Sequence, residues 1–304
     1  MANDTAGDPM SSRKWSRKSI YTVSDEMEEQ NLPICPKTVS KLLKKLAYSL
    51  KCNRKEIAET QHADRNQQFE IIAQTRALFE KLGLPMASVD MKKKELIGNF
   101  KNAGKTWCKE SEKVSIHDFR SHALGVAYPY GIYEPLTNRG LVVVGTSYDT
   151  PEFAVEAIAM WLKCSGVAHS SNINHFLILC DAGGSNGYRP RAWKYYLYQK
   201  ICQTYGMKVT VCHYPSGASK WNPIEHRMFS FISLNWAGTP LRSYETMLRY
   251  IQGTTTSKGL EIEAMLHEKE YERGIKISDK QMQEINISKH EILPQWNYTI
   301  APNA

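Results

Sequence analysis

Five short segments of strand-like composition lie between residues 86 and 212, and they constrain the fold of this chain more than any other feature. They are rich in Val, Ile, Leu and Tyr and are bounded by Gly, Pro or Asn. Helical patterns at about 151–164 and from Pro190 separate the later segments. This order predicts an α/β fold, with a mixed sheet flanked by helices on both faces. The expected strands cover 86–89, 126–133, 141–146, 175–180 and 208–212.

The composition is that of a globular protein with a moderate positive charge. The 304 residues contain 39 Lys and Arg against 31 Asp and Glu, a formal charge of +8, which is compatible with a polyanionic partner. No apolar run approaches the roughly 18 residues that cross a bilayer, and the N-terminus lacks the pattern of a secretory signal. Seven cysteines without a C-x-x-C pair indicate reduced thiols. We therefore expect a cytoplasmic, nucleoid-associated protein.

The front of the chain is helical and basic. A helical stretch at about 19–30 and a break at Asn31-Leu32-Pro33 precede a helix that begins near Lys37. Residues 31–55 contain seven basic residues and no acid. Two short helices with a tight connection predict a helix-turn-helix whose cations neutralise DNA phosphates; the alternative is an ordinary solvated helix face. The candidate DNA-binding residues are Lys37, Lys41, Lys44, Lys45, Lys51, Arg54 and Lys55.

Three acids stand where such a sheet can bring side chains together. Asp90 ends the first expected strand, Asp181 ends a central apolar strand, and Glu225 lies in the first turn of a helix after Asn222-Pro223. Ligands of open α/β sheets bind at the carboxyl ends of the strands, and carboxylates meeting there repel one another unless they share cations such as Mg²⁺. Two such ions, about 3.5–4 Å apart, suit phosphodiester chemistry.

Each of these acids also has a structural interpretation. An Asp at a strand end is often a turn former. The spacing of Asn222 and Glu225 fits a capping box, which the local sequence favours for Glu225. Asp118 and Asp149 compete with Asp90 for the first position, although Asp149 directly precedes a helix cap. The residue pattern alone leaves these alternatives open.

Several blocks, in order, resemble one known family. The first reads Ser-Val-Asp-Met-Lys-Lys-Lys-Glu-Leu at 88–96, the second Asp-Ala-Gly-Gly-Ser-Asn-Gly-Tyr-Arg at 181–189, and the third spans 213–227 and ends Trp-Asn-Pro-Ile-Glu-His-Arg. From about Asp8 to Pro302 the chain is similar to the Rhodopirellula-type DDE transposases. Members usually carry further N-terminal helices, so the resemblance suggests a shortened copy.

The resemblance implies an RNase H-like catalytic domain in which Asp90, Asp181 and Glu225 hold two Mg²⁺ ions, with Mn²⁺ as a substitute. It implies Mg²⁺-dependent cutting of transposon-end DNA by water and joining of the freed 3′-hydroxyl to target DNA, by a homodimer or larger assembly on paired ends. A catalytically inactive, DNA-binding relic is the alternative. The expected regions are an all-α helix-turn-helix region (1–55), a helical connector (56–84), the catalytic domain (85–238) and a C-terminal α+β extension packed on it (239–304).

A rival motif lies directly after Asp181. Gly183–Gly187 matches G-x-S-x-G, the nucleophile elbow of α/β-hydrolases, which would make Ser185 a nucleophile. The helix does not begin directly after this serine, no His-Gly-Gly-Gly motif precedes it, and a hydrolase leaves the basic front unexplained. We favour a loop that lets DNA backbone approach, with Ser185 and Asn186 touching phosphate. Lys220, beside Trp221, is a further candidate DNA contact.

Overall fold

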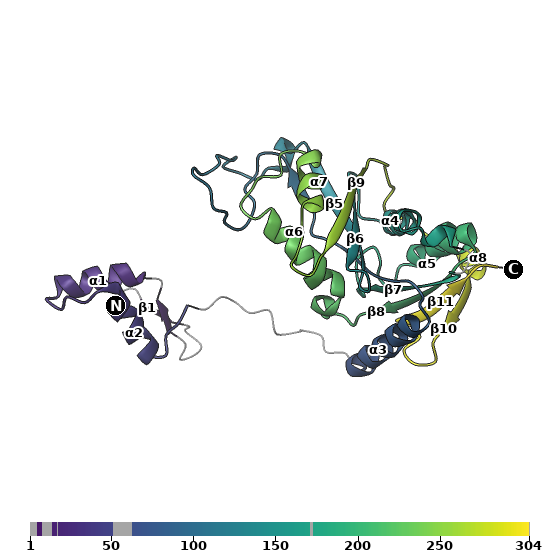
Figure 1. Ribbon diagram of the computed structural model, residues 1–304, viewed down its shortest axis with the longest axis horizontal. Helices are drawn as coiled ribbons and strands as arrows, with labels where there is room; N and C mark the ends of the chain where they lie inside the picture. The colour runs from purple at the N-terminus through teal and green to yellow at the C-terminus, as the bar shows by residue number, and fades with distance from the viewer. Residues whose placement is uncertain (1–4, 8–13, 17, 51–62, 171–172, 304) are drawn as a thin grey trace. The chain divides into compact units, whose positions relative to one another are not determined.

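The chain divides into two compact units, residues 1–57 and 58–304 (Figure 1). The computed structural model describes residues 5–7, 14–16, 18–50, 63–170 and 173–303. Within these ranges no helix is both long and apolar enough to span a bilayer. The six cysteines in the described ranges are all free thiols.

The first unit contains two helices, α1(Ile20–Glu29) and α2(Pro36–Lys45), close to the predicted positions. The Ser19 hydroxyl accepts a hydrogen bond from the Thr22 amide and caps α1, and Pro36 opens α2 with its preset φ. A small antiparallel ribbon of β1(Thr5–Gly7) and β2(Lys14–Ser16) was not expected from the sequence. The unit is therefore not entirely helical.

The apolar stripe of α2 is only partly covered. Val39 is buried, but the side chains of Leu42 and Leu46 are exposed. The predicted cations on the other faces of the helix, Lys37, Lys41, Lys44 and Lys45, are all exposed as well. The predicted DNA contacts Lys51, Arg54 and Lys55 lie outside the described residues.

The second unit is built around one nine-stranded sheet. Its strand order is β10-β11-β8-β7-β3-β5-β6-β9, and the short β4 pairs with β5. The five predicted strands are β3, β5, β6, β7 and β8. The strands are β3(Met86–Met91), β4(Glu95–Ile97), β5(Gly125–Glu134), β6(Arg139–Gly145), β7(His175–Cys180), β8(Lys208–His213), β9(Glu261–His267), β10(Asn286–Lys289) and β11(Asn297–Ala301).

The five central strands have the order and directions of an RNase H-like fold. β3, β5 and β6 form an antiparallel meander. β7 then returns to the other side of β3 and runs parallel to it, and β8 runs parallel to β7. The C-terminal region completes both sides of this sheet, because β9 pairs with β6 and β11 pairs with β8.

Helices cover both faces of the sheet (Figure 1). Side chains that alternate along β3 point to opposite faces. On one face, Ala87 and Val89 pack in the core beneath α4 and α5. On the other, a second core lies beneath α6 and α7, and α3 packs near β7 and β8. The helices are α3(Arg65–Lys81), α4(Pro151–Cys164), α5(Arg191–Leu197), α6(Ser230–Asn235), α7(Tyr244–Gln252) and α8(Asp279–Gln283).

Candidate active site

The register of two parallel strands brings Asp90 and Asp181 to the same edge of the sheet. Val89 of β3 lies opposite Cys180 of β7, so the next residue of each chain segment is one of the two aspartates. Both side chains are partly exposed there. The backbone amide of Met91 donates to Oδ1 of Asp90 at 2.8 Å, which fixes one carboxylate oxygen.

Three hydrogen bonds fasten the segment that carries Glu225 to β3. The buried Ser88 hydroxyl donates to Asn222 Oδ1 and accepts from the Ile224 amide at 3.0 Å. Asn222 Nδ2 donates to the Val89 carbonyl at 3.1 Å. The side chain of Asn222 is therefore used to hold β3 and does not cap the helix. The helix that carries Glu225 begins at Pro223, and its segment η6(Glu225–Phe229) is π-helical. The side chain of Asn222 is bonded to Ser88 and to the Val89 carbonyl, so the capping box expected as an alternative does not form.

The three carboxylates perturb one another through their charges. Burial, and then the charges of Asp181 and Glu225, raise the pKa of Asp90 well above its usual value. Burial and the Glu225 charge raise the pKa of Asp181 to about 6. Burial also raises the pKa of Glu225, although the nearby charge of Lys92 and a hydrogen bond with Asp90 oppose this shift. The proximity of these three acids therefore favours either protonation of their carboxylates or binding of cations to them.

A buried lysine, Lys92, lies near Glu225. Only 8% of the Lys92 surface is exposed; its Nζ lies 4.7 Å from the centre of the Trp236 ring and 3.7 Å from Oε1 of Glu95. Burial lowers the pKa of Lys92, and the charges of Glu95 and Glu225 counter this. Sequence reasoning missed Lys92 because it opens a run of three lysines that is typical of a solvated turn. Lys92 directly follows β3, and the alternation of side chains continued from Asp90 was the available signal.

One protein family matches almost the whole length of the chain. The family described as Rhodopirellula transposase DDE domain matches residues 1–302. The chain belongs to this family. No curated protein matches the sequence.

Solved structures of one transposase are also similar to this DDE-family chain. The Mos1 transposase paired-end complex with left transposon end is 11% identical, with a TM-score of 0.46 over 81% of this chain and 73% of that chain. The Mos1 mariner paired end complex with Mn is 14% identical, with a TM-score of 0.45 over the same shares.

A buried hydrogen-bond chain supports Asp181 of the DDE-family chain from below. Nε1 of Trp193 donates to the Tyr298 hydroxyl at 3.0 Å. That hydroxyl lies 3.0 Å from Nε2 of His213, and Nδ1 of His213 lies 3.0 Å from the Asp181 carbonyl oxygen. Since indole can only donate and a carbonyl can only accept, Tyr298 donates to His213, which donates to Asp181.

This direction requires a neutral imidazole, protonated on Nδ1. Burial lowers the pKa of His213 to about 3, so His213 is neutral at physiological pH. Tyr298 belongs to β11, which means that the C-terminal strand helps to hold the backbone at Asp181. Nothing in the local sequence around residue 298 signals this role.

A fourth carboxylate, Asp149, lies near the three predicted acids. Its charge contributes to the raised pKa of Asp90, and burial raises the pKa of Asp149 itself, partly offset by the Ser185 hydroxyl. The other rival, Asp118, is exposed and lines a separate cavity. Of the two, the structure brings Asp149 toward Asp90.

The structure corrects the predicted phosphate contacts of the glycine-rich loop. Ser185 is 5% exposed and Asn186 is 1% exposed, so neither side chain can meet a DNA backbone on the surface. Both residues occupy the central positions of a turn in which the Gly187 amide donates to the Gly184 carbonyl. Among the described residues no histidine is hydrogen-bonded to the Ser185 hydroxyl, so the hydrolase alternative lacks a general base.

The predicted contact Lys220 is exposed and belongs to a surface platform. Its Nζ lies 4.2 Å from the centre of the Trp221 ring, and the guanidinium of Arg65 lies 4.9 Å from the same ring. Trp221 is 43% exposed, so its ring lies on the surface of the unit. Sequence reasoning missed Arg65, which comes from α3 and is distant in the chain.

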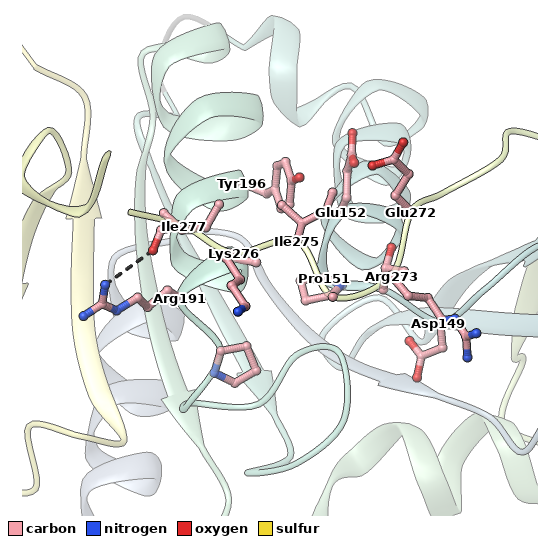
Figure 2. A pocket seen from close by; sticks show the side chains of 14 residues that line it. Asp149, Pro151, Glu152, Arg191, Tyr196, Glu272, Arg273, Ile275, Lys276 and Ile277 are labelled. Atoms are coloured by element: carbon pink, nitrogen blue, oxygen red, sulfur yellow. Dashed lines mark hydrogen bonds between the residues drawn. The ribbon is translucent and has the colours of Figure 1, made fainter. Parts of the chain in front are cut away.

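Two cavities are lined by aspartates of this region, one by Asp181 and the other by Asp149. One of about 480 Å³ includes Asp181 and the glycine-rich loop. The other, of about 570 Å³, lies between the start of α4, the start of α5 and residues 272–277 (Figure 2). In Figure 2 Asp149 and Arg273 lie at one end of this cavity, and Arg191 at the other end donates to the Ile277 carbonyl. Pro190 lines both cavities, so they adjoin.

Proposed function

We propose that this DDE-family chain is a DNA transposase that cuts transposon ends and joins them to target DNA, with Asp90, Asp181 and Glu225 as its catalytic residues. The observation that supports this most is the mutual perturbation of the three acids at one edge of an RNase H-like sheet. Membership of the DDE family over the whole chain supports the reaction class.

The donor set fits hard divalent cations such as Mg²⁺ or Mn²⁺. It consists of carboxylate oxygens, and Oδ1 of Asp181 is buried without a hydrogen-bond partner among the described residues. Within those residues no three acidic, histidine or cysteine side chains already form a group that could hold a metal ion. We therefore expect the side chains of Asp90, Asp181 and Glu225 to rotate toward one another when ions bind.

Two balanced steps make up the reaction. In the first, a water oxygen bonds to phosphorus, the bond from phosphorus to the 3′-oxygen breaks, the water loses a proton, and the departing 3′-oxygen gains one to become a 3′-hydroxyl. In the second, the oxygen of that hydroxyl bonds to a target phosphorus, the bond from this phosphorus to the target 3′-oxygen breaks, and the proton lost by the attacking hydroxyl is balanced by the proton that the departing target 3′-oxygen gains. Bound Mg²⁺ would activate the attacking oxygen and stabilise the leaving one. Asp90, Asp181 and Glu225 hold and orient the site, while Lys92 balances the charge of Glu225.

DNA is the proposed partner, bound through the exposed lysines of α2 and through Lys220 near the site. A homodimer or larger assembly would hold two transposon ends together. A chain that binds DNA without cutting it would be the relic that we considered as the alternative.

Nicking of plasmid DNA by the full chain tests the proposal. The substrate is a plasmid that carries the DNA flanking the gene for this chain, incubated with Mg²⁺. We expect Asp181→Asn and Glu225→Gln to abolish nicking while DNA binding persists. The matched control is Glu284→Gln, an exposed carboxylate after α8, which should nick like the unmutated chain. Undiminished nicking by Asp181→Asn would refute the catalytic assignment, and binding without nicking by the unmutated chain would support the relic.

A further inference from the structure

A basic cavity lies beside the turn that follows Asp90. It has a volume of about 410 Å³, and four of its lining residues are cations, Lys93, Lys94, Lys101 and Arg120. All four side chains are exposed. None of them forms an ion pair with another described residue, in contrast to Arg139, Lys200 and Arg242 elsewhere in the unit.

The acids of the cavity do not neutralise these cations. Glu95 is partly buried and pairs with Lys92, which leaves Asp118 as the unpaired acid among the lining residues. Unpaired cations gathered around one hollow give it a positive potential, which attracts anions. The cavity therefore selects an anionic ligand.

The walls of the cavity are fixed before any ligand binds. Asn102 Nδ2 donates to the carbonyls of Trp236 and Thr239, both at 3.3 Å. Phe100 and Leu241 are buried beneath the rim. The backbone of this wall therefore needs no ordering when a ligand binds.

Strand β5 connects the cavity to the carboxylates. Gly131 pairs with Asp90 of β3, and Val126, which lines the cavity, pairs with Leu96 of β4. At about 3.4 Å per residue, the five steps from Gly131 to Val126 span about 17 Å. This corresponds to about five nucleotides of a DNA strand, at 3.4 Å per nucleotide.

We propose that this cavity binds backbone phosphates of the DNA strand held at the carboxylates, about five nucleotides from the phosphodiester that is attacked. The inference rests on the proposed function and extends it from the reacting bond to the path of the strand. Exposed Lys and Arg side chains contact DNA phosphates without regard to base sequence. The site therefore binds the strand and fixes its position without selecting its sequence.

The salt dependence of DNA binding tests this proposal. The variant is the full chain carrying Lys93→Ala, Lys94→Ala and Lys101→Ala. Its binding to a 40-base-pair duplex of the gene's flanking DNA is measured at several salt concentrations and compared with that of the unmutated chain, with Ca²⁺ in place of Mg²⁺ to prevent cutting. Each lost phosphate contact lowers the slope of log K against log salt by about 0.9. We expect a loss of about 2–3 in the slope and about 100-fold weaker binding at 0.1 M salt.

The matched control removes three other exposed lysines, with Lys208→Ala, Lys258→Ala and Lys280→Ala. It loses the same net charge, and we expect its slope to change by less than one. Equal slopes for the two triple variants would overturn the cavity assignment. Arg120→Ala alone provides a second variant, with an expected slope change of about one, if the triple variant does not fold.

Photocrosslinking separates this proposal from the proposed function. A 5-iodouracil placed five nucleotides from the cleaved bond should crosslink to peptides within 93–101 or 118–126. Crosslinks confined to other peptides, in a chain that nicks DNA, would refute the cavity and leave the transposase function standing. If the chain never nicks DNA but crosslinks at these peptides, and the triple lysine variant shows the expected loss in slope, the result would support the cavity as a DNA-binding site and refute the catalytic function.

Discussion

The carboxylate edge of the sheet and the outer face of α2 both concentrate like charges, but they do so in opposite environments. At the edge, burial and mutual repulsion raise the pKa values of Asp90, Asp181 and Glu225. On α2 the lysines are exposed, and solvent and salt screen their charges. The ionised carboxylates at the edge are therefore unfavourable without a bound cation, whereas the lysine charges on α2 cost little folding free energy. Substitutions should act in an all-or-none manner at the edge and in a graded manner on the helix.

The largest effect is expected for Asp90→Asn. The substitution keeps the shape of the side chain and removes one charge that the cations need, so the rate of Mg²⁺-dependent nicking should fall by on the order of 10³-fold or more. Single-turnover nicking of the plasmid measures it. The contrasting variant is Asp118→Asn, the exposed rival, for which the loss should be less than 10-fold. A similar loss in both variants would mean that burial does not distinguish the two acids.

Tyr298→Phe should have the next largest effect, although Tyr298 belongs to the last strand. It removes the donor to His213 and so loosens the support of Asp181. Removal of such a supporting hydrogen bond typically costs 10–100-fold in metal affinity or activity. We expect the Mg²⁺ concentration for half-maximal nicking to rise by that factor. Tyr195→Phe, on α5, is the control. An unchanged Mg²⁺ dependence in Tyr298→Phe would show that the chain serves stability alone.

The pH dependence of stability should expose the buried charge of Asp181. Its pKa rises from 3.8 in the unfolded chain to about 6 in the folded chain, so this group stabilises the folded chain below about pH 4 relative to higher pH. That stabilisation is lost as the pH rises through about 6. After allowance for screening at the partly exposed edge, the change is about 1–2 kcal/mol.

The measurement is the difference in unfolding free energy between Asp181→Asn and the unmutated chain, without metal, from pH 4 to 8. A difference is needed because His213, whose pKa is lowered to about 3, destabilises the fold as the pH falls. We expect the unfolding free energy of Asp181→Asn to increase relative to that of the unmutated chain as the pH rises. Addition of Mg²⁺ at pH 8 should reduce this difference. A difference that is flat with pH would contradict the assigned perturbation of Asp181.

The smallest effect on stability is expected on α2. Lys41→Ala with Lys44→Ala should lower the slope of log K against log salt by about two if both lysines contact phosphates. The stability of the fold should change by less than about 0.5 kcal/mol, because both side chains are exposed. Binding titrations at four salt concentrations and thermal unfolding provide the two measurements. An unchanged slope would identify α2 as an ordinary solvated helix.

Strand positions and helix starts could be predicted because their signals are local. His175–Cys180 is a run of apolar residues followed by Asp181, and its strand has the predicted limits. Thr150 and Pro151 mark the start of α4 in the sequence and in the structure. The order of the blocks also identified the DDE family before any fold was known. These features depend on neighbouring residues and on their chemical types.

The loop around Ser185 and Asn186 shows where local reasoning fails. Glycine-rich, polar sequence is typical of an exposed phosphate-binding loop, but both side chains, in the turn from Gly184 to Gly187, are buried in the folded unit. Glu225 shows the same limit. Its spacing from Asn222 fits a cap, but Ser88, which is 134 residues away in the sequence, takes the Asn222 side chain.

The sequence by itself determined which residues carry charge, where the five central strands and several helices lie, and which family the chain belongs to. Tertiary structure decided which of those charges are buried together, because pKa shifts arise from packing between distant segments. It brought Asp149 toward Asp90, set Lys92 beside Glu225, and linked Tyr298 to Asp181 through His213. Each of these contacts joins different parts of the chain, and no local pattern of residues specifies its partner.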